Sequence, residues 1–288
     1  MAYERRLDRN NPGCMVFLVD QSGSMNEPVA GEQRSKADAV AEALNNLLYE
    51  LVLRCIKDEN EGPRHYYDIS VIGYGPGVGS ALGGALSGRD MVSVVDVADN
   101  PVRVEERESV AKAGADGDVG TVPRRHKFPV WVDSVADQRT PMCEALNRTG
   151  GMLATWVQQH PDSFPPIVIN ISDGAATDGD PRVWSRRIQS LATRDGSVLL
   201  FNLNVSALSA NPLFFPANAG VLENDYARLL FEMSSHLPPY MASLATGMGM
   251  SMNEGAKGFV YNADMSAVVR FLQIGTATSQ AIRSCAPA

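Results

Sequence analysis

The sequence predicts an α/β fold, with a doubly wound, mostly parallel central sheet flanked by helices and an edge β-hairpin insertion. Short apolar runs at 15–20, 67–74 and 166–172 are typical of buried strands. They alternate with stretches of helical periodicity such as 35–56, where apolar residues recur every three or four positions. This alternation of strand and helix indicates a layered sheet with helices on both faces.

The remaining elements are expected in the following order: β segments of an edge hairpin at 90–97 and 128–132, a helix near 181–194, strands at 198–205 and 258–261, and a helix from 265 to about 278. The stretch 100–127 is charged, Gly-rich and poor in large apolar residues, as in a flexible loop. We therefore predict a single domain, 1–288, with a flexible insertion at 76–127. An additional loop and helical segment is expected at 206–255, with helices at 223–233 and 239–250.

Composition excludes several classes of protein. The chain has 25 Lys and Arg against 33 Asp and Glu, a net charge of −8 without a long block of one sign, which argues against nucleic-acid binding. The 4 cysteines lack the spacing of a zinc site or a disulfide framework. No apolar stretch approaches the roughly 20 residues of a membrane span, and no apolar leader precedes residue 15. We expect a cytoplasmic protein without a membrane partner.

The motif Asp20-Gln21-Ser22-Gly23-Ser24 follows the first predicted strand directly. It places a carboxylate and two hydroxyls in one tight turn, and Gly23 lets the backbone turn sharply between the two serines. Such oxygen donors suit a hard divalent cation such as Mg²⁺. The motif therefore predicts a metal site, provided that further ligands follow in the chain.

Two later motifs offer those ligands. Asp173 follows the strand 166–172, and the carboxyl ends of neighbouring parallel strands meet at one edge of a sheet, so Asp173 is expected beside Asp20. Thr140 precedes Pro141, which suits the first position of a helix, so Thr140 is predicted as an N-cap whose hydroxyl points into the site.

Other residues compete for these roles. Asp178 is an alternative to Asp173, but we expect it to help start the helix near 181–194. Thr121 and Thr149 are alternatives to Thr140, and neither stands at a Pro-marked helix start.

Together, an Asp-x-Ser-Gly-Ser, a Thr-Pro at a helix start and a Ser-Asp-Gly after a later strand resemble a von Willebrand factor A (vWA) domain, over about residues 13–282. The resemblance implies a Rossmann-like vWA fold with a metal-ion-dependent adhesion site. The implied metal residues are Asp20, Ser22, Ser24, Thr140 and Asp173. The metal would be Mg²⁺, with Mn²⁺ or Ca²⁺ as alternatives. In such domains an acidic side chain of a partner protein completes the coordination.

The implied function is that of a cytosolic adaptor or scaffold without enzymatic activity. The chain resembles small cytosolic bacterial vWA proteins, including those associated with tellurite resistance. Such proteins work beside kinases, phosphatases or AAA+ ATPases, which are the implied partners.

The alternative function is that of a metal-dependent hydrolase or phosphatase using Asp20. Phosphotransferases of the haloacid-dehalogenase kind need a second acid two residues later, where this chain has Ser22. No Gly-x-Ser-x-Gly elbow surrounds Ser22 or Ser24, and the 4 histidines lack a triad context. The residues favour binding over turnover.

Two further segments attract attention. The Gly-rich stretch 73–79 contains no Gly-x-Gly-x-x-Gly and is interpreted as a mobile turn. Phe214 and Phe215 are expected to be exposed near the site, as a hypothetical docking rim. The methionines between 241 and 252 are interpreted as core filler.

Overall fold

A computed structural model describes residues 2–29, 33–58, 60–113, 120–206 and 211–276. Its central sheet contains β1 (Gly13–Asp20), β2 (Tyr67–Tyr74), β3 (Val78–Ser80), β4 (Val92–Ser93), β7 (Ile167–Ser172), β10 (Leu199–Val205), β11 (Leu213–Phe214) and β12 (Phe259–Ala263). Within these residues the strand order is β11-β12-β10-β7-β1-β2-β3, and β4 also pairs with β2. The long central strands begin and end close to where the apolar runs predicted.

Pairing in the centre of the sheet is parallel throughout. β1 pairs with β2 and β7, and β10 pairs with β7 and β12, all in parallel register. The short strands β3, β4 and β11 pair in antiparallel fashion. The predicted α/β fold with a mostly parallel sheet is confirmed.

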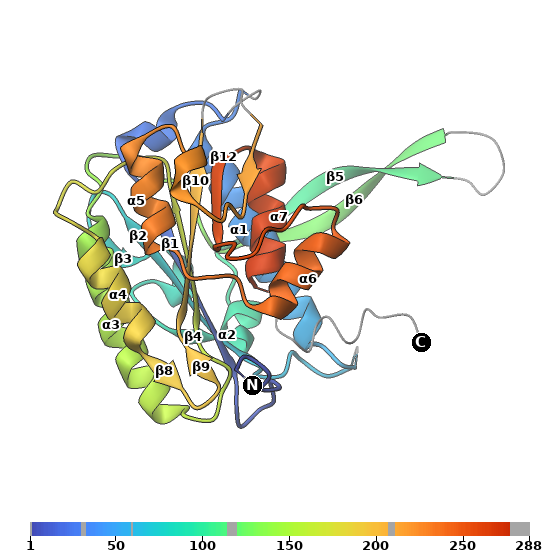
Figure 1. The fold of residues 1–288 in the computed structure, drawn as a ribbon. Helices are drawn as coiled ribbons and strands as arrows, with labels where there is room; N and C mark the ends of the chain where they lie inside the picture. The colour runs from blue at the N-terminus through green and yellow to red at the C-terminus, as the bar shows by residue number, and fades with distance from the viewer. Residues whose placement is uncertain (1, 30–32, 59, 114–119, 207–210, 277–288) are drawn as a thin grey trace.

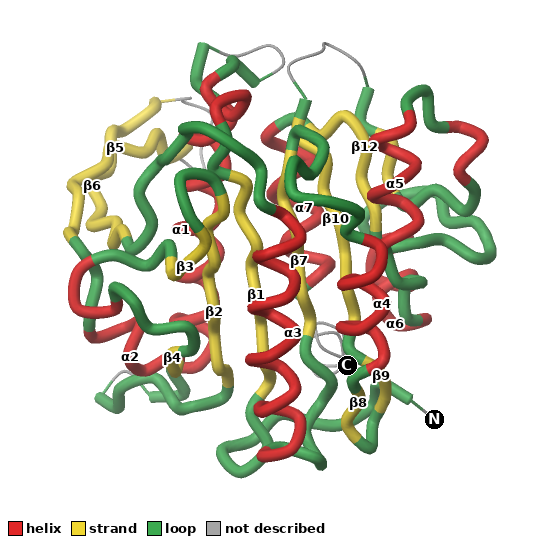
Figure 2. Tube along the Cα trace, turned by 90° about the vertical axis from the view of Figure 1, so that its left-hand side faces the viewer, coloured by secondary structure: helices red, strands yellow, loops and turns green. Residues whose placement is uncertain are grey.

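Helices cover both faces of the sheet. One face packs against α1 (Lys36–Cys55), α2 (Val94–Asp99), α6 (Pro239–Gly247) and α7 (Met265–Gly275). The other packs against α3 (Met142–Gln159), α4 (Arg182–Ser190) and α5 (Asp225–Met233). Figure 2 shows these three helices on one side of the strands. Single 3-10 turns occur at η1 (Gly23–Asn26), η2 (Gly84–Leu86) and η3 (Ala219–Val221).

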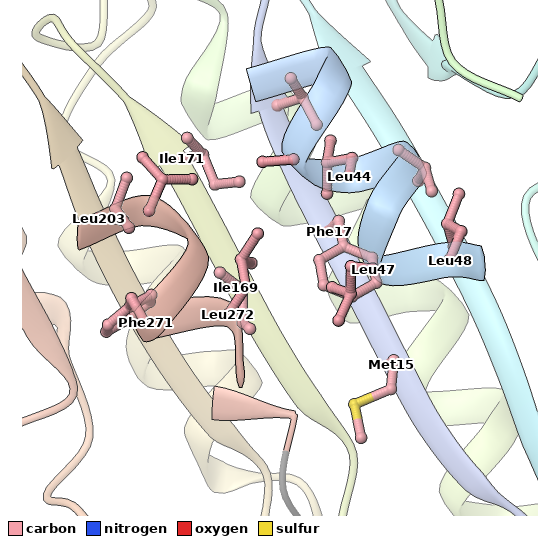
Figure 3. Packing of buried hydrophobic residues seen from close by; sticks show 14 of the residues in the cluster. Met15, Phe17, Leu44, Leu47, Leu48, Ile169, Ile171, Leu203, Phe271 and Leu272 are labelled. Carbon is pink, nitrogen blue, oxygen red and sulfur yellow. The ribbon is translucent and has the colours of Figure 1, made fainter. Parts of the chain in front are cut away.

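The core consists of two apolar layers separated by the sheet. Along β1, Met15 and Phe17 belong to the layer under α1 and α7, while Val16 and Leu18 belong to the layer under α3. Figure 3 shows the first layer, with Phe17 beneath α1. Because a strand buried on both faces has no polar side, its sequence is a continuous apolar run instead of an alternating one.

Buried amides connect three of the central strands near the carboxyl ends. The Tyr74 hydroxyl donates to Asn170 Oδ1 at 2.7 Å, and Asn170 Nδ2 donates to Asn202 Oδ1 at 2.9 Å. Asn202 Nδ2 in turn donates to Ser234 Oγ at 2.9 Å. Buried polar groups without partners are costly. These hydrogen bonds therefore favour the one register of the strands in which all four side chains meet.

A two-stranded ribbon of β5 (Arg103–Ala113) and β6 (Gly120–Val130) extends away from the body of the molecule (Figure 1). At its base the Arg107 guanidinium lies 3.6 Å from the centre of the Phe128 ring, and Arg125 pairs with Glu108 at 3.0 Å. Cross-strand pairs of this kind stabilise a ribbon whose composition is otherwise polar.

The predicted boundaries of the edge hairpin were wrong. Residues 90–97 contain β4 and the start of α2, and most of 100–127 is strand instead of irregular chain; residues 114–119 lie outside the described residues. α2 begins because Ser93 and Asp96 form a capping box, which overrides the β-propensity of the valines that follow Ser93. The ribbon strands pair with each other and therefore need no apolar run.

The segment 206–255 contains α5 and α6 as predicted, with residues 207–210 outside the described part. Phe215 is only 2% exposed and stacks on Phe271 with ring centres 6.0 Å apart, so its expected exposure was wrong. Met241 is buried, and Met250 and Met252 pack against the core as predicted, whereas Met248 is 38% exposed and for it the prediction was wrong.

The start of the chain lies at the amino end of β1. The Tyr3 amide donates to Asp195 O at 2.8 Å, and the amides of Glu4 and Arg5 donate to the Asp195 carboxylate. Asp195 joins β8 (Ala192–Thr193) and β9 (Gly196–Ser197), a small hairpin at that end of the sheet (Figure 1). In the described part of the chain, no helix has the length and apolar character needed to cross a membrane.

Candidate metal centre

The turn after β1 is held from two sides. The Gln21 amide donates to Tyr74 O at 2.8 Å, and the Gly23 amide donates to Gln138 O at 3.3 Å. Within the turn, the Ser22 amide donates to Asp20 Oδ1 at 2.9 Å. Asp20 and Ser22 are therefore placed by backbone hydrogen bonds at the carboxyl end of the sheet.

The glycines at the end of β2 make room for this turn. A Cβ atom on Gly75 would lie 2.3 Å from Gln21 O, and one on Gly73 would lie 2.2 Å from the Gln21 side-chain oxygen. The Gly-rich stretch is thus a site of close packing against the turn, which its interpretation as a mobile loop did not anticipate.

Four of the five predicted metal residues are connected by hydrogen bonds or by the turn itself. The Ser22 and Ser24 hydroxyls share a hydrogen bond of 3.1 Å, and Ser24 Oγ donates to Asp173 Oδ1 at 2.7 Å. Asp20 joins this set through the Ser22 amide. β1 and β7 are parallel neighbours, which is why residues 149 positions apart in the sequence meet here.

Thr140 lies in the neighbouring loop, two residues after Gln138. It exchanges hydrogen bonds with Thr177: its amide donates to the Thr177 hydroxyl at 3.1 Å, and its carbonyl accepts from the Thr177 amide at 3.0 Å. Thr140 is 6% exposed. Across the described residues, no hydrogen bond joins its hydroxyl to the other four predicted residues.

The start of α3 differs from the prediction. Pro141 occupies the N-cap position, and Asp178 supplies the cap by accepting from the amides of Cys143 and Glu144 at 3.0 and 2.9 Å. The expectation that Thr140 is the N-cap was therefore wrong, as was the expectation that Asp178 starts α4. A carboxylate from another loop satisfies these amides better than a proline can, because proline has no side-chain acceptor.

The rival threonines do not join the site in the described part of the chain. Thr149 is buried within α3, where its hydroxyl donates to the Ala145 carbonyl at 2.9 Å. The side chain of Thr121 lies outside the described residues.

The carboxyl group of Asp20 has a raised pKa. It is 1% exposed, and burial raises its pKa to about 6, against the lowering effect of hydrogen bonds from Ser172 and Ser22. The negative charge of Asp173 adds to the increase. A buried carboxylate with a nearby like charge is stabilised by any cation that binds between them.

Lys36 is a site residue that the sequence analysis missed. Its ammonium lies 2.8 Å from Asp173 Oδ2, 2.8 Å from Glu27 Oε2 and 3.5 Å from Ser24 O. Burial alone would lower the pKa of Lys36, but its hydrogen bonds to Asp173 and Glu27 raise it. Nothing in the apolar pattern of α1 distinguishes Lys36 from a solvent-exposed first-turn lysine.

Hydrogen bonds from Ser172, and through it from Tyr226, position the Asp20 carboxylate. Ser172 Oγ donates to Asp20 Oδ2 at 2.6 Å and shares a hydrogen bond of 2.7 Å with the Tyr226 hydroxyl. Burial, together with the charges of Asp20 and Asp173, raises the pKa of Tyr226 well above its usual value. Ser172 stands directly before Asp173, so its participation was visible in the Ser-Asp-Gly motif; the contribution of Tyr226 from α5 was not.

The donor set fits a hard divalent cation. It consists of carboxylate and hydroxyl oxygens, which Mg²⁺ prefers, and it has no nitrogen or sulfur ligand. In the described ranges there is no group of three or more His, Cys, Asp or Glu side chains arranged to hold a metal.

These features define an α/β protein with a carboxylate- and hydroxyl-lined turn at the carboxyl edge of its sheet. No family model matches the chain, and no curated protein matches it. Among solved structures it is similar to the pilus adhesin SpaC from Lactobacillus rhamnosus GG, with 12% sequence identity and a TM-score of 0.44. That match covers 97% of this chain and 31% of the adhesin chain. A similarity this low carries no argument about function.

Proposed function

We propose that this chain is a vWA-type, metal-dependent protein-binding module that holds Mg²⁺ at the turn after β1. The observation that carries the proposal is the set of contacts among Asp20, Ser22, Ser24 and Asp173. Residues from two distant parts of the sequence converge on one small group of oxygen atoms. The strand order, with β1 between β2 and β7, supports the same proposal.

The Ser22 and Ser24 hydroxyls, with that of Thr140 from the adjacent loop, would be the neutral donors for the cation. Asp20 and Asp173 supply the negative charge, and Ser172 and Tyr226 orient Asp20. A Mg²⁺ ion held largely by neutral hydroxyls remains able to accept one more oxygen ligand, such as a carboxylate of a partner protein. That is the binding chemistry the bound metal would supply.

We propose further that the chain acts as a cytoplasmic adaptor or scaffold and not as an enzyme. The Asp20 carboxylate accepts hydrogen bonds from the Ser22 amide and the Ser172 hydroxyl. Burial raises the pKa of Asp20 to about 6, so the carboxylate could take up a proton, but among the described residues its hydrogen-bond partners include no second acid or histidine to pass that proton on, which favours binding over turnover. The partner would present an acidic side chain, and an associated kinase, phosphatase or AAA+ ATPase would fit this role.

Calorimetric titration with Mg²⁺ and Mn²⁺ tests the metal site. The wild type is expected to bind one ion, and an Asp20→Ala/Ser22→Ala variant is expected to lose more than about tenfold in affinity. An Asp58→Ala variant, changed at an exposed turn, serves as the control and should bind as the wild type does. Equal binding by all three proteins would show that the site is elsewhere.

Affinity capture from a native lysate tests the binding role. A partner retained by the wild type with Mg²⁺, and released by EDTA or by the double substitution, is the expected result. Equal retention in all three conditions would contradict a metal-dependent adhesion site. Turnover of a generic phosphoester that disappears in Asp20→Asn would instead establish the alternative, hydrolytic function.

A further inference from the structure

Lys36 stands in an unusual place for a lysine. It is the first residue of α1, where the helix dipole disfavours a positive charge, and its side chain is only 5% exposed. Neither helix formation nor solubility accounts for a buried ammonium at this position. Its partners therefore explain its placement.

The main partner is Asp173. The Asp173 side chain is 1% exposed, and both of its oxygens are engaged: Oδ1 by the Ser24 hydroxyl and Oδ2 by the Lys36 ammonium. The second partner, Glu27, is 61% exposed, so solvent screens its charge more strongly. Lys36 thus acts chiefly on Asp173.

This arrangement changes the charge that a metal ion meets. Asp20 and Asp173 bring a formal charge of −2 to the site, and the buried Lys36 reduces it to −1. It also occupies Asp173 Oδ2, the oxygen that the Ser24 hydroxyl does not engage, so both Asp173 oxygens already have a partner. Both effects weaken the hold of the site on a divalent cation and leave that cation more electrophilic.

We infer that Lys36 is a built-in counter-cation that sets the metal affinity of the site, by competing with the divalent ion for the charge of Asp173. It keeps the affinity low for the metal alone, so that an incoming carboxylate contributes a large share of the final stability. The inference rests on the proposed metal site.

The test measures Mn²⁺ affinity, by calorimetry and by the electron paramagnetic resonance signal of free Mn²⁺, without any partner. Lys36→Met is expected to bind Mn²⁺ at least about tenfold more tightly than the wild type. Lys36→Gln, which keeps a hydrogen-bond donor for Asp173 but no charge, should also bind Mn²⁺ more tightly than the wild type, with a smaller gain than Lys36→Met because the donor still occupies Asp173 Oδ2. Circular dichroism of each metal-free variant verifies that it is folded.

Lys57→Met is the matched control. Lys57 is exposed just beyond the other end of α1, so its substitution changes the net charge equally without touching the site. It should leave the affinity unchanged. An equal gain in this control would mean that net charge, and not Lys36, is responsible.

Two failures are distinguishable. If the wild type binds Mn²⁺ and neither Lys36 variant binds it more tightly, the inference is wrong while the proposed metal site stands. If no protein in the series binds Mn²⁺, the proposed function fails as well. Mn²⁺ binding by the two Lys36 variants, with no binding by the wild type, would give the inference its strongest support.

Discussion

At the scale of single residues, Asp20 dominates the electrostatics of the site. Its pKa rises from 3.8 to about 6 because it is buried, with the charge of Asp173 adding to the effect. A raised carboxyl pKa means that the folded protein binds a proton more tightly than the unfolded chain. The stabilising contribution of this protonation is therefore complete below about pH 4 and is lost as the pH rises to about 6.

Asp20→Asn should remove the pH dependence of stability that arises from this carboxyl group. In EDTA, we expect the variant to gain stability over the wild type between pH 4 and pH 7, by up to about 3 kcal/mol in unfolding free energy. Urea denaturation followed by circular dichroism at several pH values measures the difference. Saturating Mg²⁺ at pH 7 should reduce the difference in unfolding free energy between the two proteins, because only the wild-type carboxylate is stabilised by the ion. A difference that does not vary with pH would contradict the origin assigned to the shift.

At the scale of elements, the turn after β1 depends on the end of β2. The two strands are in parallel register up to the pair Asp20 and Tyr74, and the chain of each then turns past the other. Gly75 lies where the backbone of Gln21 passes, and a side chain there would press on a carbonyl oxygen. The turn after β1 is thus shaped by Gly75, which directly follows another strand, β2.

Gly75→Ala should displace the turn. We expect a loss of about 1–3 kcal/mol in unfolding free energy and a weaker affinity for Mn²⁺, since the added Cβ must move Gln21 and its neighbours. Gly77→Ala is the matched control, because nothing lies within 4 Å of its added Cβ. Thermal denaturation and Mn²⁺ titration of both variants measure the changes in stability and in metal affinity. Similar behaviour of the two would show that the turn tolerates the displacement.

At the scale of the whole molecule, the β5–β6 ribbon is the most separable part of the fold. Its described contacts with the body lie at its base, where Arg107 meets Glu42 at 3.6 Å and Phe128 packs on Tyr49. The remainder of the ribbon pairs chiefly with itself. Its outer part should therefore contribute little to the stability of the body.

Shortening the ribbon tests this independence. Glu108 and Arg125 are direct partners in the register, so an Asn-Gly turn in place of residues 109–124 should close the hairpin between them. We expect the unfolding free energy to change by less than about 1 kcal/mol and Mn²⁺ affinity to stay the same. Chemical denaturation and metal titration measure both. A large loss of stability would show that the outer ribbon supports the core.

The sequence predicted most of the fold because its central strands are buried on both faces. Runs such as Ile167 to Ile171 have no polar interruption except Asn170, and the amphipathic helices between them are equally plain. The prediction failed at 90–97, where a two-residue capping box outweighs a β-prone composition, and in the ribbon, whose strands pair outside the core.

The site was predictable to the extent that it is local. Asp20, Ser22 and Ser24 are set by one turn, and Asp173 follows from the geometry of parallel strands. Lys36 was not predictable, because its role depends on how the start of α1 lies over the sheet. The cap of α3 by Asp178 likewise depends on the path of a loop that carries no periodic pattern.

The attachment of residues 3–5 to Asp195 has a practical consequence for experiments on immobilised protein. These residues lie at the amino end of β1, and Asp20 lies at the other end of the same strand. A biotin or affinity tag placed ahead of Tyr3 would attach every molecule to a sensor chip through the same end of the sheet. The face with the serines would then point away from the chip, where the protein partner proposed above could reach it.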